Sequence, residues 1–433
     1  MVAMDQRWPF GFDMRADAGE DAAEAEHGLV PVERYRLSSP AAFQIIVPAV
    51  MVNRTRRYKR DDDGGNFCAS ACSDGVQAGK LCQSCQSRRR RRLPADSGAD
   101  FRNRRGENRS MRAWVCHSLQ DDRSGLRFET EWPEPTVPGA GEVTVALTAA
   151  SLNYPDLLML SGGYQYRPEL PFIPGMEGCG IITAVGEGLS GELIDEHVIV
   201  GGRGGCLAER MTLPASALRI VPDGLHDDEA AAHTVGALTA YVGLAVRGRM
   251  QAGERVLVLG AGGGMGLAAV SMAVALGGEV VAAASTPEKL AAAKACGAHE
   301  TLLLDRAAPD FSAYKGHFDL VFDPVGGPAV MPALRTLRWG GRYLIIGFVA
   351  GAPVSLPLNR LLLAGTEVIG VRAGEYARQV PGSGPRHLRA IDTLAAEGKI
   401  NPFIGLRVPL DRAGEAFAAM ADGTLVGKAV VTF

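Results

Sequence analysis

The sequence predicts an α/β protein in which two folded domains follow a long polar N-terminal segment. Its 433 residues are more than one hydrophobic core usually serves, and 47% of them are hydrophobic, as in globular proteins. From position 111 onward, apolar strands alternate with Gly/Pro turns and amphipathic helices. Residues 253–300 read strand, glycine-rich turn, helix, strand, helix, which is the order of a parallel βαβ unit followed by its next helix.

The charge composition argues against some classes of partner. Lys and Arg total 45 and Asp and Glu total 48, a net charge of −3, so no global field attracts nucleic acid or an anionic membrane. The longest apolar runs, such as RVLVLG at 255–260, are far shorter than the roughly 20 residues of a membrane span. Acidic residues near the N-terminus are untypical of signal and transit peptides. We therefore expect a cytoplasmic protein without a membrane or nucleic-acid partner.

Residues 1–110 differ in character from the rest of the chain. They are polar and poor in periodic apolar pattern, so we expect a disordered extension or a segment wrongly included upstream of the true start. An unstructured tail is the simpler interpretation of its arginine run at 88–92, although such a run can also bind phosphate. Four-thiolate zinc binding is an alternative role for Cys68, Cys72, Cys82 and Cys85.

The turn at 260–266 predicts a dinucleotide site. Ala261, Gly263 and Gly266 fit the pattern A-x-G-x-x-G directly after the strand VLVLG and at the start of a helix. Small residues let the backbone approach a pyrophosphate, whose charge then lies at the positive end of the helix. The alternative is that they only permit close packing of the helix against the strand. The predicted cofactor contacts are Ala261, Gly262, Gly263, Gly264, Met265 and Gly266.

The end of the next strand favours NADP(H) over NAD(H). An NAD site usually carries Asp or Glu there to bind the ribose 2′-hydroxyl, whereas this strand ends at Ser285. Ser285 supplies a hydroxyl, and Lys289 supplies a positive charge, where a 2′-phosphate would lie. The alternative is that these residues form only an ordinary helix start, with Pro287 at an early helical position.

From residue 111 to residue 433 the chain resembles the medium-chain dehydrogenase/reductase superfamily, and specifically its zinc-free quinone oxidoreductase branch. The resemblance rests on GEVTVALTAASLNYPDLLMLSGGY, PFIPGMEGCGIITAVGEG, ALTAYVGL, the glycine turn and GTLVGKAVV, in the family's order and spacing. It implies a homodimer, and an active site in the cleft between two domains. These would be a GroES-like catalytic domain at 111–233, a Rossmann NADP(H)-binding domain at 234–370, and a return to the catalytic domain at 371–433.

The resemblance also identifies the positions at which zinc-dependent relatives bind their metal. Those positions hold Asn153, Met176 and Val235 in place of cysteine, histidine and cysteine. Glu177 can still offer a carboxylate, but a carboxylate beside a thioether and an amide is not a familiar zinc site. Of the relatives' four-cysteine structural lobe, only Cys206 is present. We therefore expect no metal, and we interpret Met176 as a packing residue and Glu177 as a partner of turn amides.

Without zinc, the acceptor itself must spread the negative charge that hydride transfer creates, as a quinone or an α,β-unsaturated carbonyl does. The resemblance places Asn153 and Tyr154 near the nicotinamide as catalytic candidates. Tyr154 either donates a proton or hydrogen bond or only lines the cofactor pocket. The resemblance further assigns Thr239, Gly347 and Phe348 to the nicotinamide half of the cofactor, and Tyr164 to the substrate pocket.

One departure and two alternative functions remain open at this point. Many relatives carry a tyrosine near the adenosine phosphate, where this chain has Leu304 or Asp305, and this difference weakens the preference for NADP(H). A reductase of enoyl thioesters would share every cofactor residue and differ only in its acceptor pocket. A nucleotide- or nucleic-acid-binding protein would use the basic segment before residue 111, and its binding would depend on salt.

Overall fold

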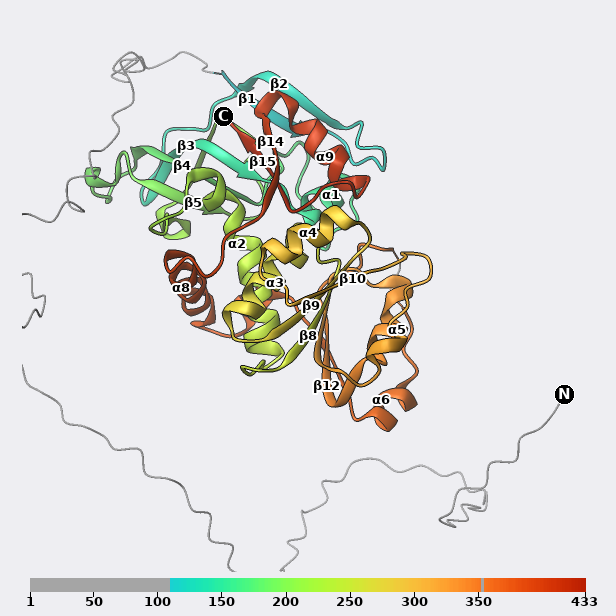
Figure 1. Cartoon of the computed structure of the whole chain (residues 1–433). Helices are drawn as coiled ribbons and strands as arrows, with labels where there is room; N and C mark the ends of the chain where they lie inside the picture. Colours follow the sequence, from blue (N-terminus) through green and yellow to red (C-terminus); the bar gives the residue numbers. More distant parts are fainter. Residues whose placement is uncertain (1–109, 352–353) are drawn as a thin grey trace, which may run out of the picture. The chain divides into compact units, whose positions relative to one another are not determined.

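The computed structural model describes residues 110–351 and 354–433. The expectations for residues 1–109, including the cysteine cluster and the arginine run, lie outside the described residues. The predicted α/β class is confirmed, because a largely antiparallel sheet is combined with a parallel sheet that carries helices (Figure 1).

The parallel sheet has six strands in the order β10-β9-β8-β11-β12-β13, as predicted for a dinucleotide-binding domain. All neighbouring strands in it run parallel. Their carboxyl ends therefore meet at one edge of the sheet, where such domains bind their ligands. The strands are β8 (Arg255–Leu259), β9 (Glu279–Ala284), β10 (Glu300–Leu303), β11 (Phe318–Asp323), β12 (Leu337–Ile345) and β13 (Glu367–Gly370).

Helices cover both faces of the parallel sheet, because its strands are apolar on both sides. In β8, Val256 and Val258 face one hydrophobic core while Leu257 and Leu259 face the other. The first core includes residues of α2 (Asp227–Tyr241), α3 (Gly264–Ala275), α4 (Pro287–Ala295), α7 (Ala373–Gln379) and α8 (Ser383–Ala396). The second is built with α5 (Val330–Leu334) and α6 (Leu358–Ala364).

The second sheet has seven strands, and the end of the chain returns to it. Its order is β14-β15-β3-β4-β5-β7, with β6 also paired to β3, and β15 pairs antiparallel with β3. A separate hairpin, β1 (Ser110–Cys116) with β2 (Leu126–Pro133), lies beside it. The seven strands are β3 (Glu142–Ser151), β4 (Glu177–Val185), β5 (His197–Gly201), β6 (Arg210–Pro214), β7 (Arg219–Ile220), β14 (Ile404–Pro409) and β15 (Lys428–Thr432).

Two helices and several short helical turns complete this part of the structure. The helices α1 (Tyr154–Leu160) and α9 (Ala413–Ala421) bury Met159, Leu160 and Phe417 against the inner face of the seven-stranded sheet. Within the described residues the 3₁₀ turns are η3 (Gly191–Leu193), η4 (Ala215–Ala217), η6 (Ser312–Tyr314), η7 (Gly327–Ala329) and η8 (Leu410–Arg412). The segment η5 (Val242–Arg247) is a π-helical continuation of α2.

Helix α2 belongs to both halves of the structure and lies between the two sheets (Figure 1). The alanines of its first half, Ala230 to Ala232, pack on the seven-stranded sheet, while Ala237 and Ala240 join the core of the parallel sheet. The boundary expected between residues 233 and 234 thus falls inside this helix. A rigid helix shared by two cores constrains the position of one sheet relative to the other.

We expect Tyr343→Phe to destabilise the parallel-sheet domain. The buried Tyr343 hydroxyl donates a 2.7 Å hydrogen bond to Oδ2 of Asp323, whose other oxygen accepts from the backbone of Val325 and Gly326. Loss of the donor leaves a buried carboxylate oxygen unsatisfied, which typically costs about 1–3 kcal/mol. The free energy of unfolding measures this effect. The matched control is Tyr314→Phe, whose ring stacks on Phe318; equal stability of the two variants would contradict the prediction.

Candidate active site

The glycine turn has the tight geometry that a pyrophosphate site requires. Helix α3 begins at Gly264 directly after the turn. A Cβ at Gly266 would lie 2.2 Å from the carbonyl oxygen of Gly260, and a Cβ at Gly262 would lie 2.2 Å from Cβ of Lys289. The first N–H groups of a helix have no intrahelical acceptor, so this turn offers donors and a positive helix end to an anion.

The ends of three parallel strands converge beside this turn. The turn follows β8, residues 324–326 follow β11, and Gly347 and Phe348 follow β12. A Cβ at Gly260 would meet Cγ2 of Val325 at 2.6 Å, and a Cβ at Gly347 would meet the Pro324 oxygen at 3.1 Å. The structure therefore brings Gly347 and Phe348 to the same sheet edge as the glycine turn. Phe348 is 44% exposed there, so its ring is accessible to a ligand.

A second group of predicted residues meets at the ends of β9 and β10. Ser285, Lys289, Leu304 and Asp305 line one open pocket. Arg306 lines it as well, and its Nε donates a 3.0 Å hydrogen bond to Oγ of Ser285. Sequence reasoning missed Arg306, although a signal existed: β9 and β10 are parallel neighbours, so the residues that follow them lie side by side.

The pocket contains two cationic groups at close quarters. The Lys289 ammonium donates to the Gly423 carbonyl at 2.6 Å, and burial together with the nearby Arg306 lowers the pKa of Lys289. Neither cation forms an ion pair with another described residue. An anion between them would relieve their mutual repulsion. The pocket is not purely basic, since three carboxylates also line it: Glu288, Asp305 and Asp422.

A buried polar cluster lies where the motifs NYPD and GMEG meet. Nδ2 of Asn153 donates to Oε1 of Glu177 at 3.0 Å, and the backbone N–H of Val235 donates to Oε2 of Glu177 at 2.8 Å. The ammonium of Lys428 reaches both side chains, at 2.7 Å from Oδ1 of Asn153 and 2.5 Å from Oε1 of Glu177. Lys428 is the second residue that sequence reasoning missed. Its signal was a lone charged residue at the start of the apolar strand KAVVT.

The expected structural roles of Met176 and Glu177 agree with this geometry. Met176 is half-buried and packs against the core of the seven-stranded sheet. Glu177 bonds a backbone amide as expected, but the amide belongs to helix α2 and not to a turn. Within residues 110–351 and 354–433, no group of three or more His, Cys, Asp or Glu side chains is arranged to hold a metal ion.

Asp156 anchors the segment that carries the catalytic candidates. Its carboxylate accepts from the backbone N–H of Asn153 at 2.8 Å and of Gly175 at 3.0 Å, tying the start of α1 to the loop before β4. Burial raises the pKa of Asp156 to about 7, and the two N–H donors and Lys428 oppose that shift only in part.

Tyr154, Tyr164 and Thr239 are partly buried and do not belong to the polar cluster. Tyr154 is the first residue of α1, half-buried, and its hydroxyl has no hydrogen-bond partner among the described residues. Tyr164 packs against the core of the seven-stranded sheet. Thr239 is half-buried on α2. No hydrogen bond within the described part of the chain joins Tyr164 or Thr239 to the other candidates.

Two family profiles match the chain. The profile described as alcohol dehydrogenase GroES-like domain matches residues 139–223, and the profile described as zinc-binding dehydrogenase matches residues 264–384. The first covers β3 to β7 and the second begins at α3.

Curated relatives and solved structures are similar over the same region. A quinone oxidoreductase-like protein 2 homolog of Nematostella vectensis is 32% identical over 329 residues, covering 75% of this chain and 89% of that protein. Quinone oxidoreductase-like protein 2 of Bos taurus is 33% identical, covering 76% and 94%. The crystal structure of the quinone oxidoreductase from Thermus thermophilus, also determined as its complex with NADPH, is 34% identical with a TM-score of 0.62, covering 75% of this chain and 100% of that one.

We expect Asp156→Asn to change how stability depends on pH. The folded protein retains a proton on Asp156 up to about pH 7, whereas the unfolded chain releases it near the ordinary value of 3.8. Between these values, this group makes the free energy of unfolding fall as pH rises, by at most about 1.4 kcal/mol per pH unit. Asparagine does not titrate, so unfolding curves from pH 4 to pH 7 should show a weaker decline in the variant. Parallel curves would contradict the prediction.

Proposed function

The chain belongs to the medium-chain dehydrogenase/reductase superfamily, and from this premise we propose that it transfers hydride from NADPH to a quinone or an α,β-unsaturated carbonyl without a metal. In this proposal the domain of the parallel sheet binds the cofactor, and the domain of the seven-stranded sheet carries the catalytic groups. The single observation that carries the proposal is the pairing of a tight glycine turn with a cationic pocket at the ends of β9 and β10.

NADP(H) is the cofactor that this arrangement fits. The glycine turn and the start of α3 suit the pyrophosphate, and Ser285, Lys289 and Arg306 suit the 2′-phosphate. Arg306 supplies a positive charge beside Leu304 and Asp305, which stand where many relatives carry a tyrosine. When bound, the cofactor supplies a hydride at its nicotinamide ring.

Tyr154 is the residue best suited to assist the acceptor. Nδ2 of Asn153 donates to Glu177 and, at 3.5 Å, to the Ser151 oxygen, and its Oδ1 accepts from Lys428. Asn153 therefore orients the start of α1, and both of its amide hydrogens are engaged. Tyr154 follows it directly, and the Tyr154 hydroxyl has no hydrogen-bond partner in the part of the chain that the structure describes. A hydrogen bond from this hydroxyl to the acceptor oxygen stabilises the negative charge that develops there.

The polar cluster does not fit a zinc ion. Its donors are an amide, a carboxylate and an ammonium, and the Lys428 ammonium already lies 2.5 Å from Oε1 of Glu177. A zinc ion needs thiolate, imidazole or carboxylate ligands, and a cation bonded to the available carboxylate competes with it. The description zinc-binding dehydrogenase therefore does not extend to a catalytic zinc in our proposal.

Oxidation of NADPH by the purified protein against quinones, enones and enoyl thioesters tests the proposal. We expect turnover with quinones or enones and no change after exhaustive chelation. Loss of activity on chelation would overturn the metal-free mechanism. Turnover restricted to enoyl thioesters would identify a thioester reductase instead. A protein without NADPH oxidation whose nucleic-acid binding is lost with residues 1–110 would reassign the function altogether.

The choice between NADPH and NADH should depend on Arg306. Arg306→Ala removes a charge-assisted contact worth roughly 1.5–3 kcal/mol, so NADPH affinity should fall by about one to two decades while NADH affinity stays almost unchanged. Lys289→Ala is less selective, because its stem packs on Gly262 of the glycine turn. Ser285→Asp should go further than Arg306→Ala, since it repels the phosphate and can accept from the ribose hydroxyl.

Affinities of both cofactors, measured by fluorescence titration, check these expectations. Arg389→Ala is the matched control, because Arg389 lies exposed on α8 away from the pocket. An unchanged NADPH/NADH affinity ratio in Arg306→Ala and Ser285→Asp would contradict the phosphate site.

Tyr154→Phe should slow the reaction while leaving the cofactor bound. A positioned proton or hydrogen-bond donor typically contributes about 10²–10⁴ in rate, so kcat should fall by a factor in that range, with the dissociation constant of NADPH unchanged. Steady-state kinetics and a binding titration separate the two effects. Wild-type kcat in this variant would mean that Tyr154 only lines the pocket.

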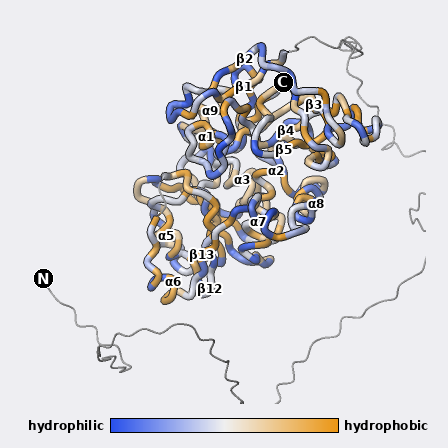
Figure 2. Tube along the Cα trace, turned by 180° about the vertical axis from the view of Figure 1, so that it is seen from behind, coloured by the Kyte–Doolittle hydropathy of each residue, from blue (hydrophilic) through white to orange (hydrophobic). Residues whose placement is uncertain are grey.

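The homodimer remains a prediction, and the structure offers one surface that suits it. Strand β13 is an edge of the parallel sheet, and β12, β13 and α6 lie together at one end of that domain (Figures 1 and 2). Leu358, Leu362 and Trp339 there are 77%, 78% and 76% exposed. Such an apolar group next to an open strand edge is typical of an interface.

Leu362→Glu should therefore yield a monomer by light scattering. The control, Val137→Glu, changes an even more exposed apolar residue of the other domain and should remain dimeric. A wild-type monomer, or a Leu362→Glu dimer, would contradict this interface.

A further inference from the structure

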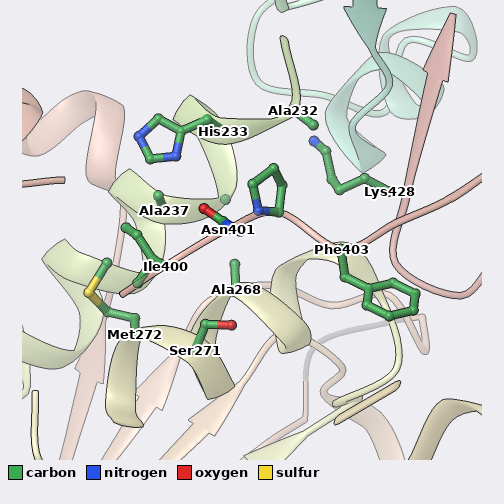
Figure 3. A pocket seen from close by; sticks show the side chains of 13 residues that line it. Ala232, His233, Ala237, Ala268, Ser271, Met272, Ile400, Asn401, Phe403 and Lys428 are labelled. Carbon is green, nitrogen blue, oxygen red and sulfur yellow. The ribbon is translucent and has the colours of Figure 1, made fainter. Parts of the chain in front are cut away.

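Lys428 is a charged residue in an interior position. It begins strand β15, and its side chain is only 7% exposed. Glu177, its counter-charge, has a side chain 1% exposed. Two ionised groups are removed from water here, and such burial is tolerated only when each charge is paired and hydrogen-bonded. In Figure 3 the ammonium of Lys428 points from its strand towards α2, near Ala232.

The contacts of this pair form a closed ring. Lys428 donates to Asn153 and to Glu177, and Asn153 in turn donates to Glu177. Helix α2 is joined to the ring by the N–H of Val235. Asn153 immediately precedes Tyr154, the first residue of α1. The ring therefore fixes where helix α1 begins and, with it, the position of Tyr154.

The segment that carries Lys428 also touches the glycine turn. The N–H of Gly427 donates to the Gly262 oxygen at 2.8 Å, and Gly263 and Gly427 form a parallel bridge. The stem of Lys428 lies against the start of α3, where a Cβ at Gly264 would come within 2.6 Å of its Cδ. Gly427 thus contacts the glycine turn, and the next residue, Lys428, contacts the polar cluster of Asn153 and Glu177.

We propose that Lys428 is a positioning residue for hydride transfer, which holds Asn153 and Tyr154 in their reactive arrangement and transmits occupancy of the glycine turn to them through Gly427. This inference rests on the proposed function and deepens it. Lys428 acts through Asn153 and Glu177 and is not itself required to contact the acceptor.

A purely structural ion pair is the competing explanation, and four variants separate the two. Lys428→Met leaves Glu177 as a buried carboxylate without its counter-charge, so it should be strongly destabilised. The double variant Glu177→Gln/Lys428→Met removes both charges and should recover much of that stability. Glu177→Gln alone completes the double-mutant cycle formed with Lys428→Met and the double variant. Lys399→Met, which changes an exposed lysine paired with Glu397, is the matched control.

The decisive comparison is between stability and turnover in the double variant. If Lys428 positions the reactive groups, kcat should remain depressed by about 10²-fold, the cost typical of a small misplacement, while the unfolding temperature recovers. Affinity for NADPH, measured by fluorescence titration, should change much less than kcat. Recovery of kcat together with stability, or wild-type kcat in Lys428→Met, would overturn the proposal.

A measurement on the wild-type protein does not depend on how well the variants fold. Hydrogen exchange with and without NADPH should show added protection of the backbone amides of Tyr154, Asp156 and Lys428 when the cofactor is bound. NADPH binding and acceptor reduction without that protection would overturn this inference alone. Protection on binding without reduction of any acceptor would overturn the proposed function and leave the coupling intact. Failure to bind NADPH would overturn both.

Discussion

The buried ion pair between Lys428 and Glu177 is the constraint on which the rest of the site depends. It joins the last strand of the chain to β4, and through Asn153 and Val235 it reaches the start of α1 and the middle of α2. Neither charge would be tolerated alone in a dry interior. The geometry of the cluster is therefore strongly determined, because every polar group in it must find its partner in order for the fold to be stable.

This constraint combines with a second one at the glycine turn. Parallel strands bring their carboxyl ends to one edge, and the turn between β8 and α3 presents backbone donors there. Gly427, far from this turn in sequence, donates a backbone hydrogen bond to Gly262, and the residue that follows Gly427 is Lys428. Residues 427 and 428 thus join the glycine turn to the polar cluster of Asn153 and Glu177, while α2 packs on both sheets.

The pocket at the ends of β9 and β10 has a different character. It is open and lined by charged side chains, and its cations lack ion-pair partners among the described residues. These partly or fully exposed side chains contribute little to the stability of the fold, so their charges are available to recognise a ligand. The polar groups of Asn153, Glu177 and Lys428 bond to one another, whereas Lys289 and Arg306 bond only to uncharged groups among the described residues.

The sequence by itself determined the fold class, the parallel βαβ unit at 253–300 and the glycine turn, because each follows from local period and turn chemistry. It also brought Ser285 and Lys289 into consideration, since both lie within one helical turn of a strand end.

Only the tertiary structure revealed Arg306 and Lys428. Arg306 meets Ser285 through strand pairing, and Lys428 meets Asn153 across 275 positions of the chain. It also showed that α2 runs through the boundary expected at residues 233 and 234. Periodicity reports which face of an element is buried, but the partner of a buried charge is decided by packing between elements far apart in sequence, which no local pattern records.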